Sequence, residues 1–379
     1  MNLAVLIATK SQYQVLDHFA EKLHEALLRC HVRSTLCPLD SGGLHYLLKD
    51  LPTATLQFNG ALTHNDTGLR ICDLLEIPHL LLALDPIYRF WGVLGNPRIY
   101  LASDDRNYVT WLKHRGIERT FFFPHGVERE LAEEKREEKK YPIAYLASWI
   151  DCEGLRDQWK ENFDAQVVDV MEAVIAEATK KDYFSVFEEL YPQLPANVRF
   201  RYFSGDEILI AIEVYLKGKY RLELLKAMQP HQVHLFGNGL ETLPWGRYFS
   251  EEEQERLILH GQVSYKEALL VTKQSQILLH SGLPHKDGGH ERVFTAPLCS
   301  SLIVTQKNPF LEETFEDEKS LIFYDQQQLE GLGERLTPYV KNSSLCDPLI
   351  EEGKKQVLRH HTWDHRAALL VDAVNHLIL

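Results

Sequence analysis

The chain has 379 residues, of which 45% are hydrophobic and 25% charged, and its formal net charge is −13. These proportions are typical of a soluble globular protein, and the length favours two domains that each bury a core. The negative charge, with no basic run interleaved with aromatic residues, argues against a nucleic-acid partner. An anionic small ligand would therefore have to be held by a local group of donors.

The first residues, MNLAVLIATK, form a short apolar run without a basic leader or a small-residue cleavage site. This pattern favours a β-strand over a signal peptide. The longest apolar stretches, such as 77–87, are far shorter than the roughly 20 residues that cross a bilayer. We expect a cytoplasmic protein with no transmembrane segment, and leave contact with a membrane surface open.

Strands and helices alternate in the first 125 residues. Residues 4–9 predict a strand, and apolar residues at helical spacing predict a helix over 14–29. Four further apolar runs predict buried strands, each ending at a polar residue, Gly or Pro: 55–60, 79–84, 98–103 and 120–125. This succession predicts a parallel sheet with helices on both faces.

A highly charged segment of mixed sign, 128–140, predicts a solvated linker or an exposed helix. An apolar strand follows at 141–149, so we place the domain boundary near residue 140. Residues 155–229 predict a helical elaboration of the second domain, which extends over 141–361. The remaining strands of this domain are predicted at 232–239, 260–265, 276–281, 301–306 and 320–325.

The last helix, over 362–379, has a clear start. Thr362 can cap it, and Asp364 lies in the first turn, where the helix dipole favours a negative charge. Trp363 begins an apolar face that must be buried against another element.

A glycine-rich loop, HKDGGH at 285–290, stands between a predicted strand and a predicted helix. Gly288 and Gly289 allow close approach of a ligand to the backbone, and a helix N-terminus attracts a phosphate. Arg292 can add a positive charge, with His290 as a second donor. The alternative is a plain surface turn followed by a solvated arginine.

Other strand ends offer further contacts. Gly237 and Asn238 lie in a Gly-Asn-Gly turn after one strand, and Ser281 ends another. A nucleotide base could stack on Tyr265 or bond to the backbone of Val263. A purely local explanation of this last segment is a capping box, in which Ser264 caps a helix and Glu267 bonds back.

The segment ERVFTAPLCSSLIVTQKNPFLEETFEDEKSLIFYD, followed by GKKQVLRHHTWDHRAALLV, resembles the glycosyltransferase-like family named after the spore-maturation protein CgeB. This family is a branch of the GT-B superfamily, and weaker similarities extend to LALDP at 82–86, HGVE at 125–128 and the strand AYLASW. The resemblance implies two Rossmann-like, doubly wound domains around a cleft, a donor site in the second domain, and a last helix that crosses back to the first.

Two departures from the family pattern stand out. Many GT-B glycosyltransferases have two acidic residues eight positions apart for the donor sugar and ribose, whereas this chain has Asp287 and Thr295. Ser300 replaces the glycine of the family. These changes suggest an unusual donor or a lost activity.

The resemblance implies a glycosyltransferase that moves a sugar from a UDP-, GDP- or dTDP-linked donor to a protein, a glycan or a cell-surface polymer. An inverting enzyme of this kind needs a base from the first domain, for which Asp85 is the first candidate, followed by His64 and His125. The alternatives are that Asp85 only caps a loop, or that a retaining enzyme needs no base. A nucleotide-sugar epimerase and a degenerate GT-B scaffold or binding protein remain as other functions.

The sequence predicts no metal site and no required cofactor. The 18 histidines show no HExxH or similar spacing, and the six cysteines form no CxxC pair. A helix dipole and an arginine can together replace Mg²⁺ at a diphosphate. The sequence predicts no oligomeric state.

Overall fold

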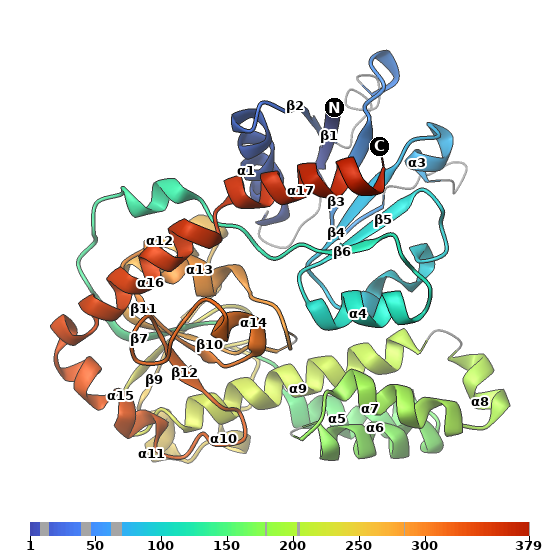
Figure 1. Cartoon of the computed structure of the whole chain (residues 1–379). Coiled ribbons are helices and arrows are strands. Elements are labelled where there is room, and N and C mark those ends of the chain that lie inside the picture. The colour runs from blue at the N-terminus through green and yellow to red at the C-terminus, as the bar shows by residue number, and fades with distance from the viewer. Residues whose placement is uncertain are drawn as a thin grey trace.

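The computed structural model describes residues 1–7, 15–38, 47–61, 70–178, 180–202, 205–283 and 285–378. Its two six-stranded parallel sheets belong to two Rossmann-like domains (Figure 1). The first sheet ends before residue 123 and the second begins at Tyr141. The predicted boundary near residue 140 falls between them.

The first sheet has the order β2-β1-β3-β4-β5-β6. Its strands are β1 (Asn2–Ile7), β2 (Arg33–Pro38), β3 (Ala54–Phe58), β4 (His79–Ala83), β5 (Ile99–Ser103) and β6 (Thr120–Phe122). Every residue of β3 and β4 is buried, as expected for central strands of a sheet covered on both faces. Helix α1 (Val15–Arg29) agrees with the predicted helix within one residue.

The second sheet has the order β12-β11-β10-β7-β8-β9. Its strands are β7 (Tyr141–Leu146), β8 (Val233–Phe236), β9 (Leu257–Gly261), β10 (Ser275–His280), β11 (Leu302–Gln306) and β12 (Ile322–Tyr324). The strand predicted at 260–265 is wrong in position, because β9 ends at Gly261, whose φ of +85° turns the chain away.

A helical block separates β7 from β8, as the sequence predicts. It comprises α5 (Cys152–Asn162), α6 (Ala165–Glu177), α7 (Tyr183–Leu190), η4 (Tyr191–Gln193), α8 (Ala196–Arg201) and α9 (Asp206–Lys226). Figure 1 shows this block beside α4 (Arg106–His114) of the first domain. The Tyr88 hydroxyl lies 2.9 Å from that of Tyr183 and donates to Glu213 at 2.6 Å. The block therefore joins the two domains on one side of the cleft.

The last helix, α17 (Trp363–Leu377), crosses back to the first domain and packs along α1 (Figure 1). Trp363 is 1% exposed and lies 5.6 Å from Phe19 and 6.0 Å from Phe58 between ring centroids. The backbone N–H of Trp363 donates to the backbone carbonyl of Val127 at 3.0 Å. The apolar face of the predicted helix is thus buried in the first core.

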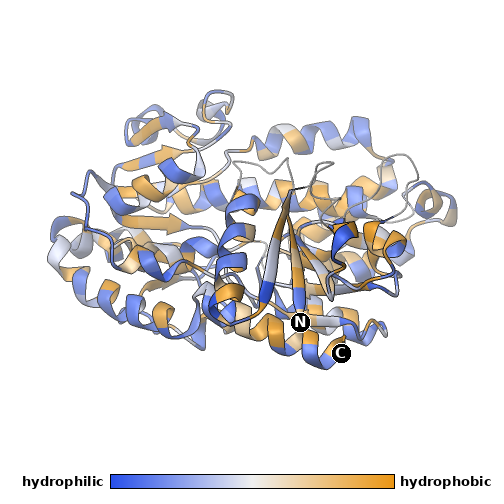
Figure 2. Ribbon diagram, turned by 90° about the horizontal axis from the view of Figure 1, so that it is seen from above, coloured by the Kyte–Doolittle hydropathy of each residue, from blue (hydrophilic) through white to orange (hydrophobic). Residues whose placement is uncertain are grey.

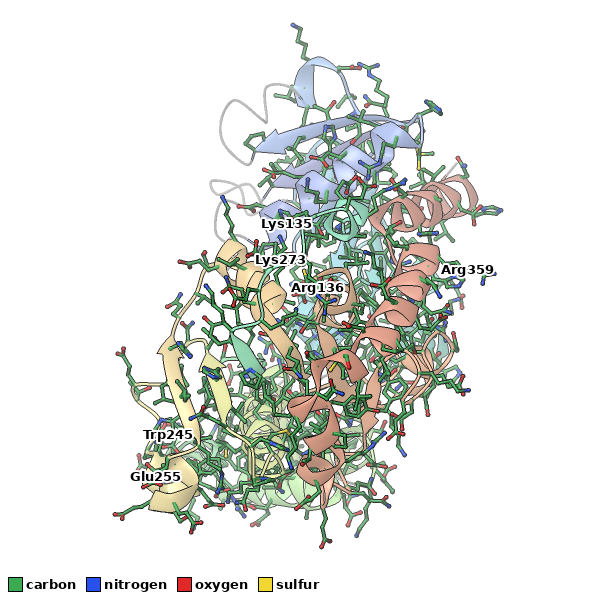
Figure 3. All side chains as sticks on the ribbon, turned by 90° about the vertical axis from the view of Figure 1, so that its left-hand side faces the viewer. Lys135, Arg136, Trp245, Glu255, Lys273 and Arg359 are labelled. Carbon is green, nitrogen blue, oxygen red and sulfur yellow. The ribbon has the colours of Figure 1, made fainter. Side chains whose placement is uncertain are left out.

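The charged segment before β7 contains one 3₁₀ turn, η3 (Arg129–Ala132), and is otherwise irregular up to β7. Contacts with the second domain hold it in place: Lys273 Nζ lies 2.5 Å from Glu134, and Arg136 lies 2.6 Å from Asp347. Figure 3 shows Lys135, Arg136 and Lys273 in the same region of the surface. The predicted linker is therefore exposed but attached.

The remaining helices cover the sheets. They are α3 (Ile71–Leu74), η2 (Ile87–Val93), α10 (Trp245–Tyr248), α11 (Glu251–Gln254), α12 (Tyr265–Gln274), α13 (Glu291–Leu298), α14 (Pro309–Glu312), α15 (Leu332–Lys341), η5 (Ser343–Leu345) and α16 (Asp347–His360). Hydrophobic residues gather on the strands and on one side of the flanking helices (Figure 2). Within the ranges that the structure describes, no helix has the length and apolar character of a membrane span.

Candidate active site

A cavity of about 430 Å³ lies between the two domains. Its walls come from the carboxyl ends of strands in both sheets, where parallel α/β folds bind ligands. Seven residues that the sequence singled out line it: Asp85, His125, Gly237, Val263, Tyr265, His290 and Arg292. The cavity is also lined by residues for which the sequence predicts no role, among them Phe19, Asn59, Ser148 and Glu291.

Asp85 follows β4 and lies on the wall formed by the first domain. The Asn59 side chain makes two hydrogen bonds with Asp85. Asn59 Nδ2 donates to Asp85 Oδ2 at 3.0 Å, and Asn59 Oδ1 accepts from the backbone N–H of Asp85 at 3.2 Å. Burial raises the pKa of Asp85, although the nearby charges of Arg89 and Lys217 oppose this shift. The carboxylate is therefore oriented, and it is more basic than in water.

His125 also lines the cavity, and it belongs to a buried cluster with Asp104 and His285. Asp104 Oδ2 is 2.8 Å from His285 Nε2 and 3.4 Å from His125 Nε2. Burial alone would raise the pKa of Asp104, but the two imidazoles hold it well below its usual range. The cluster joins the end of β5 in the first domain to the loop before α13 in the second.

These three side chains are also a set that could hold a metal ion, since one ligand atom from each lies within 4.8 Å of the others. The distance of 2.8 Å between Asp104 and His285 is that of a charge-assisted hydrogen bond, which accounts for their proximity without an ion. His125 Nδ1 is buried and has no partner among the described residues. The absence of a metal requirement stays a prediction.

The glycine-rich loop takes a different place from the one that the sequence predicts. Gly288 pairs with Asp105 as an isolated antiparallel bridge, and a Cβ on Gly288 would lie 2.0 Å from the carbonyl oxygen of Asp104. The Asp287 N–H donates to Asp105 at 3.2 Å, and a Cβ on Gly289 would meet the Phe294 ring at 2.8 Å. Asp287 and Gly288 therefore contact the first domain, whereas Gly289 packs against its own domain. None of the three lines the cavity.

The start of α13 does line the cavity, through His290, Glu291 and Arg292. His290 is the N-cap, and its ring accepts from the Arg292 N–H at 3.3 Å. The Arg292 side chain donates through Nη1 to the Leu146 carbonyl at 2.8 Å, and its Nε lies 3.8 Å from Glu291. Burial would raise the pKa of Glu291, but His290 and Arg292 hold it well below its usual range. This wall therefore carries a buried carboxylate beside the predicted arginine.

Thr295 and Ser281 are buried and do not line the cavity. Thr295 lies one turn into α13, and its hydroxyl has no hydrogen-bond partner among the residues that the structure describes. Ser281 follows β10. The predicted contact between the Thr295 hydroxyl and a ribose is therefore not supported by its position.

The other end of the cavity is formed by the Gly-Asn-Gly turn and the start of α12. Gly237 has a φ of +129°, and a Cβ there would lie 1.8 Å from the Ala147 carbonyl oxygen. The Asn238 carbonyl accepts from the Trp149 N–H at 2.7 Å, so this turn fixes the chain after β7. Only glycine permits the close approach of residue 237 to the Ala147 carbonyl.

Tyr265 begins α12 and contacts the first domain. Its ring lies 4.8 Å from that of His18 and 6.2 Å from that of Phe19. Ser264 and Glu267 form the capping box that the sequence predicts. The capping box does not exclude a contact with a nucleotide base, because Val263 and Tyr265 also line the cavity, and that contact stays a prediction. The remaining catalytic candidate, His64, lies outside the described residues.

Comparison with known proteins agrees with this architecture. A sequence model of a family described as glycosyl transferase-like matches residues 220–372, which include α13 and most of the second sheet. The match covers less than half of the chain, and it leaves out β7 of the second sheet. A search of curated proteins finds no significant match.

Solved structures with the same fold cover nearly the whole chain. Sucrose-phosphate synthase from Thermosynechococcus elongatus has a TM-score of 0.55 at 10% identity, over 100% of this chain and 99% of its own. An alpha-glucosyltransferase in complex with UDP and a 13-mer DNA has a TM-score of 0.57 at 10% identity, over 99% of each chain. Anabaena Alr3699/HepE in complex with UDP has a TM-score of 0.51 at 9% identity, over 99% of this chain and 100% of its own.

The chain has the GT-B fold. Together with the family match, this fold supports a glycosyltransferase. The narrower resemblance to the CgeB-type branch is not confirmed by these comparisons.

Proposed function

We propose that the protein transfers a sugar from a nucleoside diphosphate donor, with UDP as the first nucleotide to test, to an acceptor hydroxyl. The observation that carries this proposal is the interdomain cavity, which has the start of α13 and Arg292 on one wall and the oriented carboxylate of Asp85 on the other. Its volume of about 430 Å³ is within the range of small-ligand sites, roughly 300–1,000 Å³.

The second domain binds the donor. The positive end of the α13 dipole and the guanidinium of Arg292 face the diphosphate, and they stabilise the charge that develops as it leaves. The base lies near Val263 and Tyr265, at the start of α12. Neighbouring structures that contain UDP or UDP-glucose support this choice of ligand.

The first domain activates the acceptor. Asp85 takes the proton of the attacking hydroxyl, and its raised pKa suits it to that role. Asn59 keeps the carboxylate pointed at the cavity. No residue in this scheme requires a metal or another cofactor, and the acceptor's identity is the part of the reaction that the site leaves open.

A thermal-shift screen with UDP, GDP, dTDP and ADP tests the donor site, because a ligand that binds only the folded state raises the melting temperature. We expect one nucleotide to raise it by several degrees at millimolar concentration. Incubation of the matching nucleotide sugars, with detection of free nucleoside diphosphate, then separates a transferase from an epimerase. No shift with any of the four nucleotides would contradict the proposal and favour a degenerate scaffold.

A further inference from the structure

The donor wall of the cavity carries little net charge at the start of α13. Arg292 lies 3.8 Å from Glu291, which is 7% exposed and stays ionised beside it. The positive charge of Arg292 is therefore largely offset before any ligand arrives. A diphosphate carries about two negative charges, so a further cation is needed at this wall.

Arg221, on α9, meets that need. Its Nη1 donates to the carbonyl of Ser148, a residue that lines the cavity, and its Nε is buried with no partner among the described residues. Two residues earlier, the Leu146 carbonyl accepts from Arg292. Two guanidinium groups are thus bonded to the same short backbone segment, 146–148.

No carboxylate balances Arg221 within ion-pair distance in the described part of the chain. Glu213, whose charge does act on Arg221, is already paired with Arg89 at 2.9 Å and with Lys217. Burial lowers the pKa of Arg221, and the nearby charge of Arg292 lowers it further. Two like charges held close together, one of them with its Nε buried, cost stability unless an anion joins the two.

We propose that Arg221 is a positioning residue of the donor site, which supplies the second positive charge for the phosphate groups of a nucleoside diphosphate from behind segment 146–148. This inference rests on the proposed function and deepens it. It also gives the helical block a role, because α9 brings a charge to a site built mainly by the strand ends and α13. Arg292 contacts the anion directly. Arg221 instead holds the Ser148 carbonyl in place and attracts the anion through its electrostatic field.

Binding of UDP and of uridine, measured by calorimetry, tests this inference in Arg221→Met and Arg221→Lys. Lys219→Gln is the matched control, because Lys219 lies on the same helix in a partly exposed pair with Glu223 and does not line the cavity. We expect Arg221→Met to weaken UDP binding about tenfold or more, the scale of one charge-assisted contact, while uridine binding changes less than twofold. Arg221→Lys retains most of the UDP affinity, and Lys219→Gln matches the unaltered protein.

The melting temperature of the ligand-free protein separates this role from a structural one. If the charge of Arg221 is uncompensated without ligand, Arg221→Met has an equal or higher melting temperature and a smaller increase with UDP. A lower melting temperature with equal losses for UDP and uridine would show that Arg221 only supports the fold. If UDP binds the unaltered protein and Arg221→Met equally well, this inference is wrong and the proposed function stands. If UDP does not bind the unaltered protein, the UDP donor site and this inference both fail.

Discussion

The substitution Asp85→Asn tests the chemistry that we assign to the first domain. Asparagine has the same shape and keeps an oxygen that can accept from Asn59 Nδ2, now 3.0 Å from Asp85 Oδ2. The side chain should therefore stay in place while its capacity to take a proton is lost. Removing a general base costs about 10²–10⁴ in rate, or about 3–5 kcal/mol in activation free energy.

The assay is turnover of the nucleotide sugar identified by thermal shift, with nucleotide affinity measured in parallel. We expect kcat to fall by at least about a hundredfold while UDP affinity stays within a factor of two, since the phosphate-binding groups lie on the opposite wall. In the unaltered protein kcat should rise with pH through the raised pKa of Asp85, and this rise should disappear in the variant.

A matched control comes from Asp73, which lies in the same domain and accepts from Asn96 Nδ2 at 3.0 and 2.8 Å but does not line the cavity. Asp73→Asn removes one charge of the same kind and should leave kcat unchanged. Full turnover by Asp85→Asn would refute the role of this carboxylate as the base, and would favour His125 or a retaining reaction.

Three further outcomes are expected. Asp104→Asn should lower the melting temperature more at pH 6 than at pH 9, because the raised pKa of His285 stabilises the fold at acidic and neutral pH and this effect is lost as pH rises through it; equal losses at both pH values would contradict this. Trp363→Ala should cost about 3–5 kcal/mol in urea unfolding, since this side chain is 1% exposed; a cost below 1 kcal/mol would contradict the packing of α17. Dialysis against EDTA should leave nucleotide binding unchanged, and binding that depends on a metal would contradict the predicted absence of a metal requirement.

The sequence predicts the central strands well, because their signal is local. β3 and β4 are apolar runs whose every residue is buried, and they lie within a residue or two of the predicted ranges. The edge strand β2 was not predicted, since only one of its residues is buried and its sequence, RSTLCP, has no continuous apolar run. Sheet edges need less apolar surface, so their pattern is weaker.

Several of the predicted site residues line one cavity, while others make protein contacts that the sequence does not predict. Some polar residues after strands do gather at the cavity, and the same rule would have found Asn59, which follows β3 and lines it. It would also have found Asp104, which follows β5 and contacts His125 of the cavity wall. The partner of the glycine-rich loop is Asp105, 183 positions before Gly288. Spacing within the loop carries no information on such a contact, so a turn that suits a phosphate cannot be distinguished from one that suits another backbone.

The neutral side chain of Thr295 is explained by its proximity to Glu291. The two residues are four positions apart on α13, so they share one face of the helix, and both are buried. A carboxylate at 295 would place a second buried negative charge one turn from the first, and each would raise the pKa of the other. The neutral hydroxyl avoids this repulsion. The GT-B pattern leads one to expect an acid at 295. Helix α13 lacks this acid but already has the carboxylate of Glu291 in its first turn, where the helix dipole favours a negative charge. Loss of an acid at one position therefore does not by itself indicate loss of activity.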